Sequence, residues 1–225
     1  ERIPISISTA VLRGENGEII GGVETFRDLT LVEELRKALR NKYTLGDIIG
    51  RSPAMQRLFE ILPQVAESDS TVLIEGPSGT GKTMLAKRAP TILPGLTADE
   101  SIETTQVYSA VGRLAAGQSL LARRPFRSPH HTISNAGLVG GGSIPSPGEI
   151  SLAHNGVLFM DEFPEFPRAV LETLRQPIET GEVMVARANA HIKYPCRFLL
   201  VAAANPCKCG YLMDPARACA RVPQC

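Results

Sequence analysis

Eight consecutive residues have the side chains and the spacing of a phosphate-binding loop. They match the pattern G-x-x-x-x-G-K-[ST] in full and are Gly76, Pro77, Ser78, Gly79, Thr80, Gly81, Lys82 and Thr83. Glycines let backbone N–H groups turn toward phosphate oxygens, and a helix starting near Gly81 would add its positive N-terminal end. We expect Lys82 to reach the β- and γ-phosphates of ATP and the Thr83 hydroxyl to bind Mg²⁺. A glycine turn with only a structural role would not explain Lys82 and Thr83.

Two carboxylates, Asp161 and Glu162, directly follow the apolar run at residues 157–160. If that run is a strand, both acids lie at the C-terminal edge of the sheet, where open α/β sheets bind ligands. We expect Asp161 to hold Mg²⁺, directly or through water, and Glu162 to orient and deprotonate the attacking water. An apolar run before Asp-Glu is often only a strand end, and the phosphate-binding loop is what favours the catalytic interpretation.

A polar amide, Asn205, follows a second apolar run at residues 198–203. At the tip of a strand between the two motif strands, it would reach the γ-phosphate and the attacking water. The alternative is a turn-forming Asn before Pro206. We also count Ile48 and Ile49 among the expected nucleotide-binding residues.

Four of the five cysteines are crowded at the end of the chain, at Cys207, Cys209, Cys219 and Cys225. Their near-and-far spacing predicts a small zinc knuckle, with reduced structural thiols as the alternative. Cys196 precedes a buried strand and is expected in the core. His130 and His131 are adjacent and do not easily face one metal, so we expect packing or phosphate contacts from them.

Three apolar runs, at residues 71–74, 157–160 and 198–203, predict buried strands separated by helices. Strands and helices in this alternation form a parallel sheet with crossover connections, hence an α/β fold. Ser52 and Pro53 predict the start of an amphipathic helix with Met55, Leu58, Phe59 and Leu62 on one face. Pro63 is expected to kink or end this helix.

The first 29 residues predict a β-hairpin. Apolar alternation at residues 5–12 and 19–26 flanks a turn at residues 14–17, and Thr30 with Glu33 then forms a capping box that opens a helix. This arrangement resembles the exit of a PAS sensor domain. A hairpin from another small domain is the alternative.

Composition is that of an ordinary globular protein: 225 residues, 43% hydrophobic, 21% charged and a net charge of +1. A net charge this small does not predict a broad nucleic-acid-binding surface, but it is compatible with a local basic patch. No apolar run has membrane-spanning length, and no signal segment opens the chain. Because the chain starts at Glu1 and stops at Cys225 among the cysteines, we expect a piece of a cytoplasmic protein.

Two stretches of the chain resemble two families of AAA+ ATPases. Residues 1–82 resemble an NtrC-type, sigma-54-dependent activator. The matching residues are Ile-Ile-Gly-Arg-Ser-Pro-Ala-Met at 48–55 and residues 72–82. From residue 83 the chain resembles magnesium-chelatase-like ATPases of the ComM type, on residues 124–134, 147–156 and 204–207. The chain is thus an apparent chimera joined at the phosphate-binding loop, as a natural recombinant, an engineered crossover or an assembly artefact.

The resemblance implies an organisation and partners. It implies a PAS-like remnant at 1–29, a linker helix at 30–44 and an AAA+ core without its lid at 45–225, with the cysteine-rich segment at 206–225. It also implies a ring, with a hexamer expected, that acts on DNA. The sigma-54 contact motif is absent from residues 137–145, so sigma-54 is an unlikely partner and transcription regulation is the alternative function. A non-catalytic, nucleotide-dependent interaction module is the second alternative.

In the ComM-type family two hairpins point at the ring's central pore, and their counterparts here are residues 140–149 and 182–193. The second contains Arg187, Asn189, His191 and Lys193, which suit a phosphate backbone. A solvated hairpin explains them equally well. The basic residues Arg123, Arg124 and Arg127 are expected on the surface, where they are solvated or contact DNA or a neighbouring subunit.

The resemblance also places a catalytic arginine and a lid after Asn205, beyond Cys225. Three arginines near that strand, Arg197, Arg217 and Arg221, fit neither family position. We therefore expect ATP binding with steady-state phosphate release near background, little changed by Glu162→Gln.

Overall fold

The computed structural model describes residues 3–31, 44–45, 48–50, 52–66, 68, 70–141, 145–187 and 190–207. The chain divides into two compact units, Glu1–Phe59 and Glu60–Cys225, and each is described by itself. The domain limits expected at residues 29 and 45 stay predictions.

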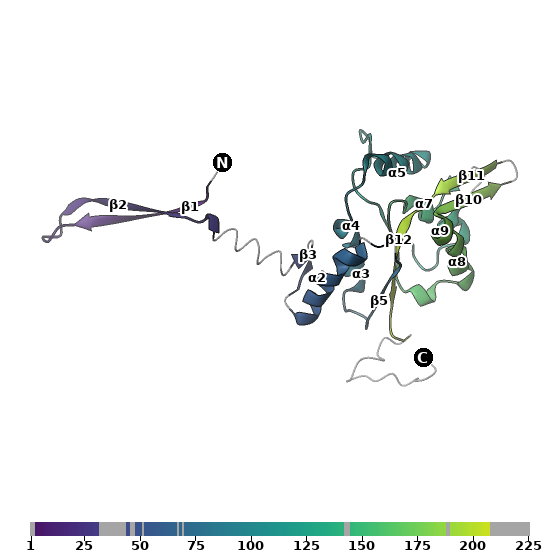
Figure 1. The fold of residues 1–225 in the computed structure, drawn as a ribbon, viewed down its shortest axis with the longest axis horizontal. Helices are drawn as coiled ribbons and strands as arrows, with labels where there is room; N and C mark the ends of the chain where they lie inside the picture. Colours follow the sequence, from purple (N-terminus) through teal and green to yellow (C-terminus); the bar gives the residue numbers. More distant parts are fainter. Residues whose placement is uncertain are drawn as a thin grey trace. The chain divides into compact units, whose positions relative to one another are not determined.

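The first unit contains the predicted hairpin. Strands β1 (Ile5–Arg13) and β2 (Ile19–Asp28) pair antiparallel, with Ile7 opposite Phe26 (purple in Figure 1). The turn between them closes through the Gly14 N–H, which donates to the Glu18 carbonyl at 2.8 Å. Two short strands, β3 (Thr44–Leu45) and β4 (Ile48–Ile49), also pair antiparallel. Most of the predicted linker helix at 30–44 lies outside the described residues.

Helix α2 (Pro53–Ala66) starts as predicted, because the Ser52 hydroxyl oxygen accepts a hydrogen bond from the Met55 N–H at 3.3 Å. The helix continues three residues past Pro63, so the expectation that Pro63 could end it is wrong. A proline removes a single N–H from the helix ladder, and here the helix tolerates that loss in its last turn.

The second unit is built on a parallel sheet of four strands in the order β5 (Val72–Glu75), β12 (Phe198–Ala204), β9 (Gly156–Met160) and β6 (Phe126–Arg127). The predicted α/β class is confirmed, and β12 lies between the strands of the two motifs. Strand β9 is buried along its whole length. Strand β5 is less buried than predicted, with Leu73 60% exposed, because it is the edge strand of the described sheet.

Each face of this sheet has its own apolar core. Val157 and Phe159 of β9 pack with helices α3 (Lys82–Ala86) and α4 (Ala89–Ile92). Leu158 and Met160 pack on the opposite face, against residues of α6 (Asn135–Val139), α7 (Glu149–Leu152) and α8 (Arg168–Thr173). Figure 1 shows α3 and α4 on one side of β12, and α7, α8 and α9 (Arg175–Thr180) on the other. This alternation fixes β9, and the residues that follow it, from both sides.

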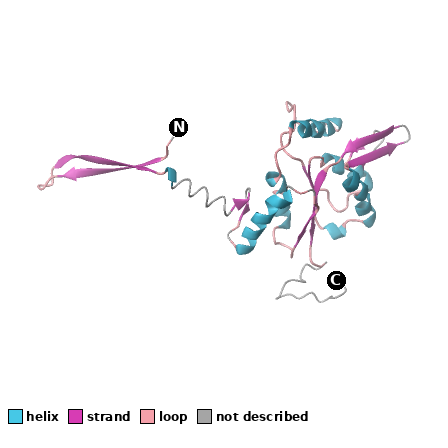
Figure 2. Cartoon of the chain, in the orientation of Figure 1, coloured by secondary structure: helices cyan, strands magenta, loops and turns pink. Residues whose placement is uncertain are grey.

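The remaining elements lie around this centre. Helix α5 (Ala98–Ala110) begins with a capping box between Thr97 and Glu100, and a 3₁₀ turn, η1 (Phe163–Glu165), follows β9. The two predicted hairpins are β7 (Gly140–Gly141) with β8 (Ser146–Pro147), and β10 (Glu182–Arg187) with β11 (Ala190–Pro195). Figure 2 shows β10 and β11 as the pair of long magenta strands at the upper right. Cys196 is buried, which confirms its expected place in the core and raises the pKa of its thiol to about 12. None of the described helices has the length and apolarity needed to cross a bilayer.

Candidate nucleotide-binding site

The phosphate-binding loop connects β5 to α3, at the C-terminal edge of the sheet. Gly79 and Gly81 have φ angles of 83° and 84°, in the left-handed region that glycine occupies without steric cost. Gly81 caps the helix that begins at Lys82. The Gly76 N–H donates to the carbonyl of Ala204 at 3.3 Å, which ties the start of the loop to the end of β12. The local sequence thus forms the strand-loop-helix unit that the motif predicts.

Lys82 lies inside the loop. Its Nζ donates to the carbonyl oxygens of Gly76 and Pro77, at 2.7 and 2.9 Å, and to Oδ1 of Asn205 at 2.8 Å. An ammonium group only donates, so the Asn205 amide must turn its oxygen toward Lys82 and its NH₂ group away. The structure therefore brings together a lysine and an amide that are 123 positions apart in the sequence.

Thr83 and Asp161 also meet across the site. The Thr83 hydroxyl donates to Oδ2 of Asp161 at 2.7 Å. Hydroxyl and carboxylate oxygens are ligands that Mg²⁺ prefers, and here one of each converges on the same point at the edge of the sheet. The residues present therefore fit the magnesium ion that the sequence predicts.

Glu162 follows Asp161 with an uncommon backbone. Its φ and ψ are 53° and 45°, one of two left-handed non-glycine residues in the described chain. Its N–H donates to Oδ1 of Asp161 at 3.0 Å, and its side chain is 56% exposed. Such strain is found where the surrounding structure requires a particular side-chain direction.

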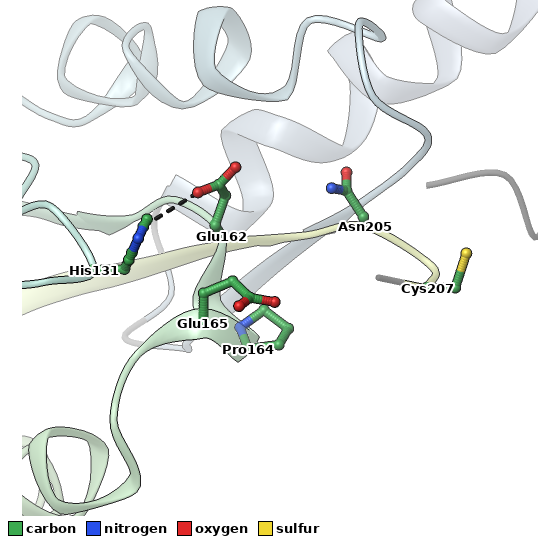
Figure 3. Close-up of a pocket in the computed structure, with 6 residues that line it drawn as sticks. All are labelled: His131, Glu162, Pro164, Glu165, Asn205 and Cys207. Carbon is green, nitrogen blue, oxygen red and sulfur yellow. Dashed lines mark ion pairs between the residues drawn. The ribbon is translucent and has the colours of Figure 1, made fainter. Parts of the chain in front are cut away.

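The carboxylate of Glu162 faces a pocket of about 450 Å³ (Figure 3). The described residues lining it are His131, Glu162, Pro164, Glu165, Asn205 and Cys207. Nδ1 of His131 lies 3.2 Å from Oε2 of Glu162. Sequence reasoning missed this contact, because it treated His131 as a packing or phosphate-contacting residue. The signal available was a polar residue shortly after β6, the strand that pairs with β9.

Two further groups of predicted ligands are not tested by the described residues. Cys207 is buried beside the pocket, whereas Cys209, Cys219 and Cys225 lie outside the described residues, and zinc binding stays a prediction. Ile48 is buried within the first unit. The role of Ile48 and Ile49 in nucleotide binding also stays a prediction.

The arginines expected on the surface mostly bind within the fold. Arg124 donates to the carbonyls of Pro94 and Asn155, at 2.6 and 2.7 Å, and pairs with Glu100 at 3.2 Å. Arg127 binds both carboxylate oxygens of Glu149, at 2.5 and 2.6 Å. This hydrogen bonding raises the pKa of Arg127. The surface expectation is wrong for both arginines, because sequence-distant partners use their donors.

A glycine-rich loop joins a parallel strand to a helix, and two carboxylates follow a second strand that is separated from the first by one strand of the sheet. This arrangement defines a P-loop nucleotide-binding fold of the AAA+ type. The family described as magnesium chelatase, subunit ChlI, matches residues 45–225. The chain belongs to this family.

Three similar proteins extend the comparison. Competence protein ComM of Haemophilus influenzae is 51% identical over 76% of this chain and 33% of its own length. A signal-transduction and transcriptional-control protein of Clostridium beijerinckii is 30% identical over 89% of this chain and 30% of its own length. A solved complex of the BchI and BchD subunits of magnesium chelatase aligns at 24% identity with a TM-score of 0.50, over 68% of this chain and 52% of that one.

The chain thus spans about a third of the length of the curated relatives it matches. The resemblance to magnesium-chelatase-like, ComM-type ATPases is confirmed, and the activator-like resemblance is the weaker one. The structural likeness shows the shared fold. A junction between the two families at the phosphate-binding loop stays a prediction.

Proposed function

We propose that this chain is an ATP- and Mg²⁺-binding ATPase core. The observation that carries the proposal is the convergence of Lys82, Thr83, Asp161 and Asn205 at one edge of the sheet. These four residues come from the phosphate-binding loop and from the ends of two strands. They supply a cation for phosphate, oxygen ligands for a metal and an amide donor, which is the set of groups that phosphoryl transfer needs.

Each group has a role that its surroundings support. Lys82 would exchange its contacts with loop carbonyls for phosphate oxygens, while Thr83 and Asp161 would hold Mg²⁺, which neutralises charge on the β- and γ-phosphates. Glu162 would take the proton of the attacking water. The Asn205 NH₂, directed away from Lys82, would donate to the γ-phosphate or to that water.

ATP affinity tests this function directly. Lys82→Ala should weaken binding by about a hundredfold or more, because it removes charge-assisted hydrogen bonds of about 1.5–3 kcal/mol each. Lys87→Ala is the matched control, since Lys87 is an exposed lysine just after α3. Calorimetric titration with ATP and Mg²⁺ measures both. Equal affinity in wild type and Lys82→Ala would exclude the proposed site.

We further propose that this chain hydrolyses ATP slowly. None of the described residues that line the pocket is an arginine, and an arginine on the γ-phosphate contributes about 10³–10⁵ in rate. Steady-state turnover should therefore stay well below about one per second. Faster turnover that is lost in Glu162→Gln would contradict this.

We also propose two kinds of partner. Family membership supports a ring of several copies. A DNA substrate is proposed from the polar side chains in the sequence of residues 182–193. On the hairpin, Lys193 is exposed but pairs with Glu182 at 2.9 Å, so a DNA backbone would have to compete for it. DNA affinity should fall steeply with salt if phosphates are bound.

For the zinc prediction, metal analysis should find about one zinc per chain, and the zinc should be lost when Cys207 and Cys209 are both replaced by serine.

A further inference from the structure

The amide oxygen of Asn205 has no part in the function proposed above, which uses only the NH₂ group of this side chain. Asn205 directly follows β12 and lines the pocket that Glu162 faces (Figure 3). Its Oδ1 accepts a hydrogen bond from Nζ of Lys82 at 2.8 Å. A hydrogen bond from an ammonium is charge-assisted and stronger than one between neutral groups. The cation expected to bind phosphate therefore already has a strong partner within the protein.

The position of Asn205 is fixed by the sheet. Strands β12 and β5 pair in parallel, with Ala204 opposite Glu75, and the Gly76 N–H donates to the Ala204 carbonyl at 3.3 Å. Asn205 is thus held next to the first residues of the phosphate-binding loop. Its side chain is short, whereas Lys82 reaches it through a flexible four-carbon stem. When the two side chains separate, Lys82 is therefore the partner that moves.

All three N–H donors of the Lys82 ammonium have an acceptor within the fold. The carbonyl oxygens of Gly76 and Pro77 lie 2.7 and 2.9 Å from Nζ, and Oδ1 of Asn205 lies at 2.8 Å. An ammonium has only three donors, so a phosphate oxygen has to replace one of these acceptors. Gly76 and Pro77 belong to the loop that folds around the phosphates, whereas Asn205 lies beside the open pocket. The Asn205 oxygen is therefore the acceptor that a phosphate replaces.

We propose that the Asn205 oxygen selects ATP over ADP by competing for Lys82. Binding of either nucleotide costs the contact between these two side chains. ATP offsets this cost because its γ-phosphate accepts from the Asn205 NH₂ group, whereas ADP has no γ-phosphate and gains nothing there. After hydrolysis the same oxygen binds Lys82 again and promotes the release of ADP. The inference rests on the proposed binding of phosphate by Lys82, and it assigns to Asn205 an effect on ADP that a contact with the γ-phosphate does not explain.

Two substitutions at Asn205 remove the acceptor in different ways. Asn205→Leu keeps nearly the same side-chain volume, and Asn205→Ala leaves space for water beside the pocket. Calorimetric titrations with ADP and with ATP, both in the presence of Mg²⁺, give the two affinities of each variant. The matched control is the same pair of substitutions in the Lys82→Ala background, because the competition requires Lys82. Thermal unfolding verifies that each variant is folded.

We expect ADP to bind about three- to tenfold more tightly to both variants than to the wild type, because Lys82 no longer leaves a charge-assisted hydrogen bond when it binds the diphosphate. ATP should gain less or bind more weakly, since its γ-phosphate also loses the Asn205 donor. A fluorescent ADP analogue should dissociate more slowly from both variants. In the Lys82→Ala background, the loss of Asn205 should leave the affinity for ADP unchanged.

Three results would overturn the inference. They are unchanged or weaker ADP binding in the folded Asn205 variants, an equal gain in affinity for ATP and ADP, or the same gain in the Lys82→Ala background. If Lys82→Ala binds ATP as tightly as the wild type, the proposed function fails, and this inference fails with it. If Lys82→Ala weakens ATP binding as expected and ADP affinity does not rise in the Asn205 variants, this inference alone fails.

Discussion

Polar residues lie at both the C-terminal and the N-terminal edge of the central sheet, but they differ in how their hydrogen bonds are satisfied. At the C-terminal edge, Glu162 and Asn205 line a pocket of about 450 Å³. Lys82 donates to Asn205 there, and Asp161 accepts a hydrogen bond from Thr83. At the N-terminal edge, the residues before β9 and β12 line part of a pocket of about 440 Å³. Pocket size therefore does not distinguish the edges, and the difference lies in how their polar groups are satisfied.

At the N-terminal edge the polar groups bind one another. His154 is fully buried, accepts the Arg197 N–H at Nδ1 at 3.1 Å, and places Nε2 3.1 Å from Oε2 of Glu103. Asn155 donates to Thr104 at 3.2 Å. At the other edge a carboxylate is left more than half exposed on a left-handed backbone. Satisfied polar groups stabilise a fold, whereas exposed and strained ones remain available for a ligand.

The largest expected effect concerns His154. His154→Ala should lower the free energy of unfolding by about 2–4 kcal/mol, because it leaves a cavity and buried partners without hydrogen bonds. ATP affinity should not change. Chemical denaturation and calorimetric titration measure the two quantities, and an equally large loss of ATP affinity would mean that the two edges are not separate in function.

Asp161 should behave in the opposite way. Asp161→Ala should abolish the strengthening of ATP binding by Mg²⁺, an effect of about tenfold or about 1.4 kcal/mol, with little change in stability. Glu165→Ala is the control, since Glu165 is an exposed carboxylate four positions further along that lines the pocket faced by Glu162. A normal Mg²⁺ response in Asp161→Ala would remove this residue from the proposed metal site.

The free energy of unfolding, measured as a function of pH, should show the contribution of His154 at the N-terminal edge. Burial lowers the pKa of His154 below its ordinary value of 6.5, despite the opposing contact with Glu103. The unfolded chain therefore binds a proton that the folded chain resists, so His154 stabilises the fold fully above pH 6.5 and less as the pH falls below it. The slope should be at most about 1.4 kcal/mol per pH unit.

His154→Gln provides the comparison for this slope. Between pH 6.5 and 4.5, the free energy of unfolding of the variant should depend less steeply on pH than that of the wild type. Below the ordinary Glu pKa of 4.5, the lowered pKa of Glu103 also contributes to the slope. Identical slopes would show that His154 is not the group that titrates.

The smallest effect is expected at Arg197. Its guanidinium pairs with Glu103 at 3.2 Å but is 67% exposed, and exposed pairs contribute about 1 kcal/mol or less. Arg197→Ala should therefore change stability by no more than that and leave ATP affinity unaltered. A larger change in stability would indicate that the pair supports the buried histidine more strongly than its exposure suggests.

The central elements could be predicted from the sequence because their signals are local. The phosphate-binding loop needs glycines at fixed positions, and Gly79 and Gly81 do adopt left-handed angles. The run before Asp161 and Glu162 is apolar at every position because β9 is buried on both faces. Strands separated by helices were enough to predict a parallel sheet, whereas the place of β12 between the two motif strands was expected from the AAA+ resemblance.

Which distant side chains meet depends on the tertiary structure. The sequence predicts that Lys82, Asp161, Glu162 and Asn205 lie at one edge, because strand ends of a parallel sheet share an edge. It did not show that His131 contacts Glu162 or that Arg127 binds Glu149. A contact of this kind depends on strand order, loop path and rotamer together, and no periodicity in the chain encodes those three.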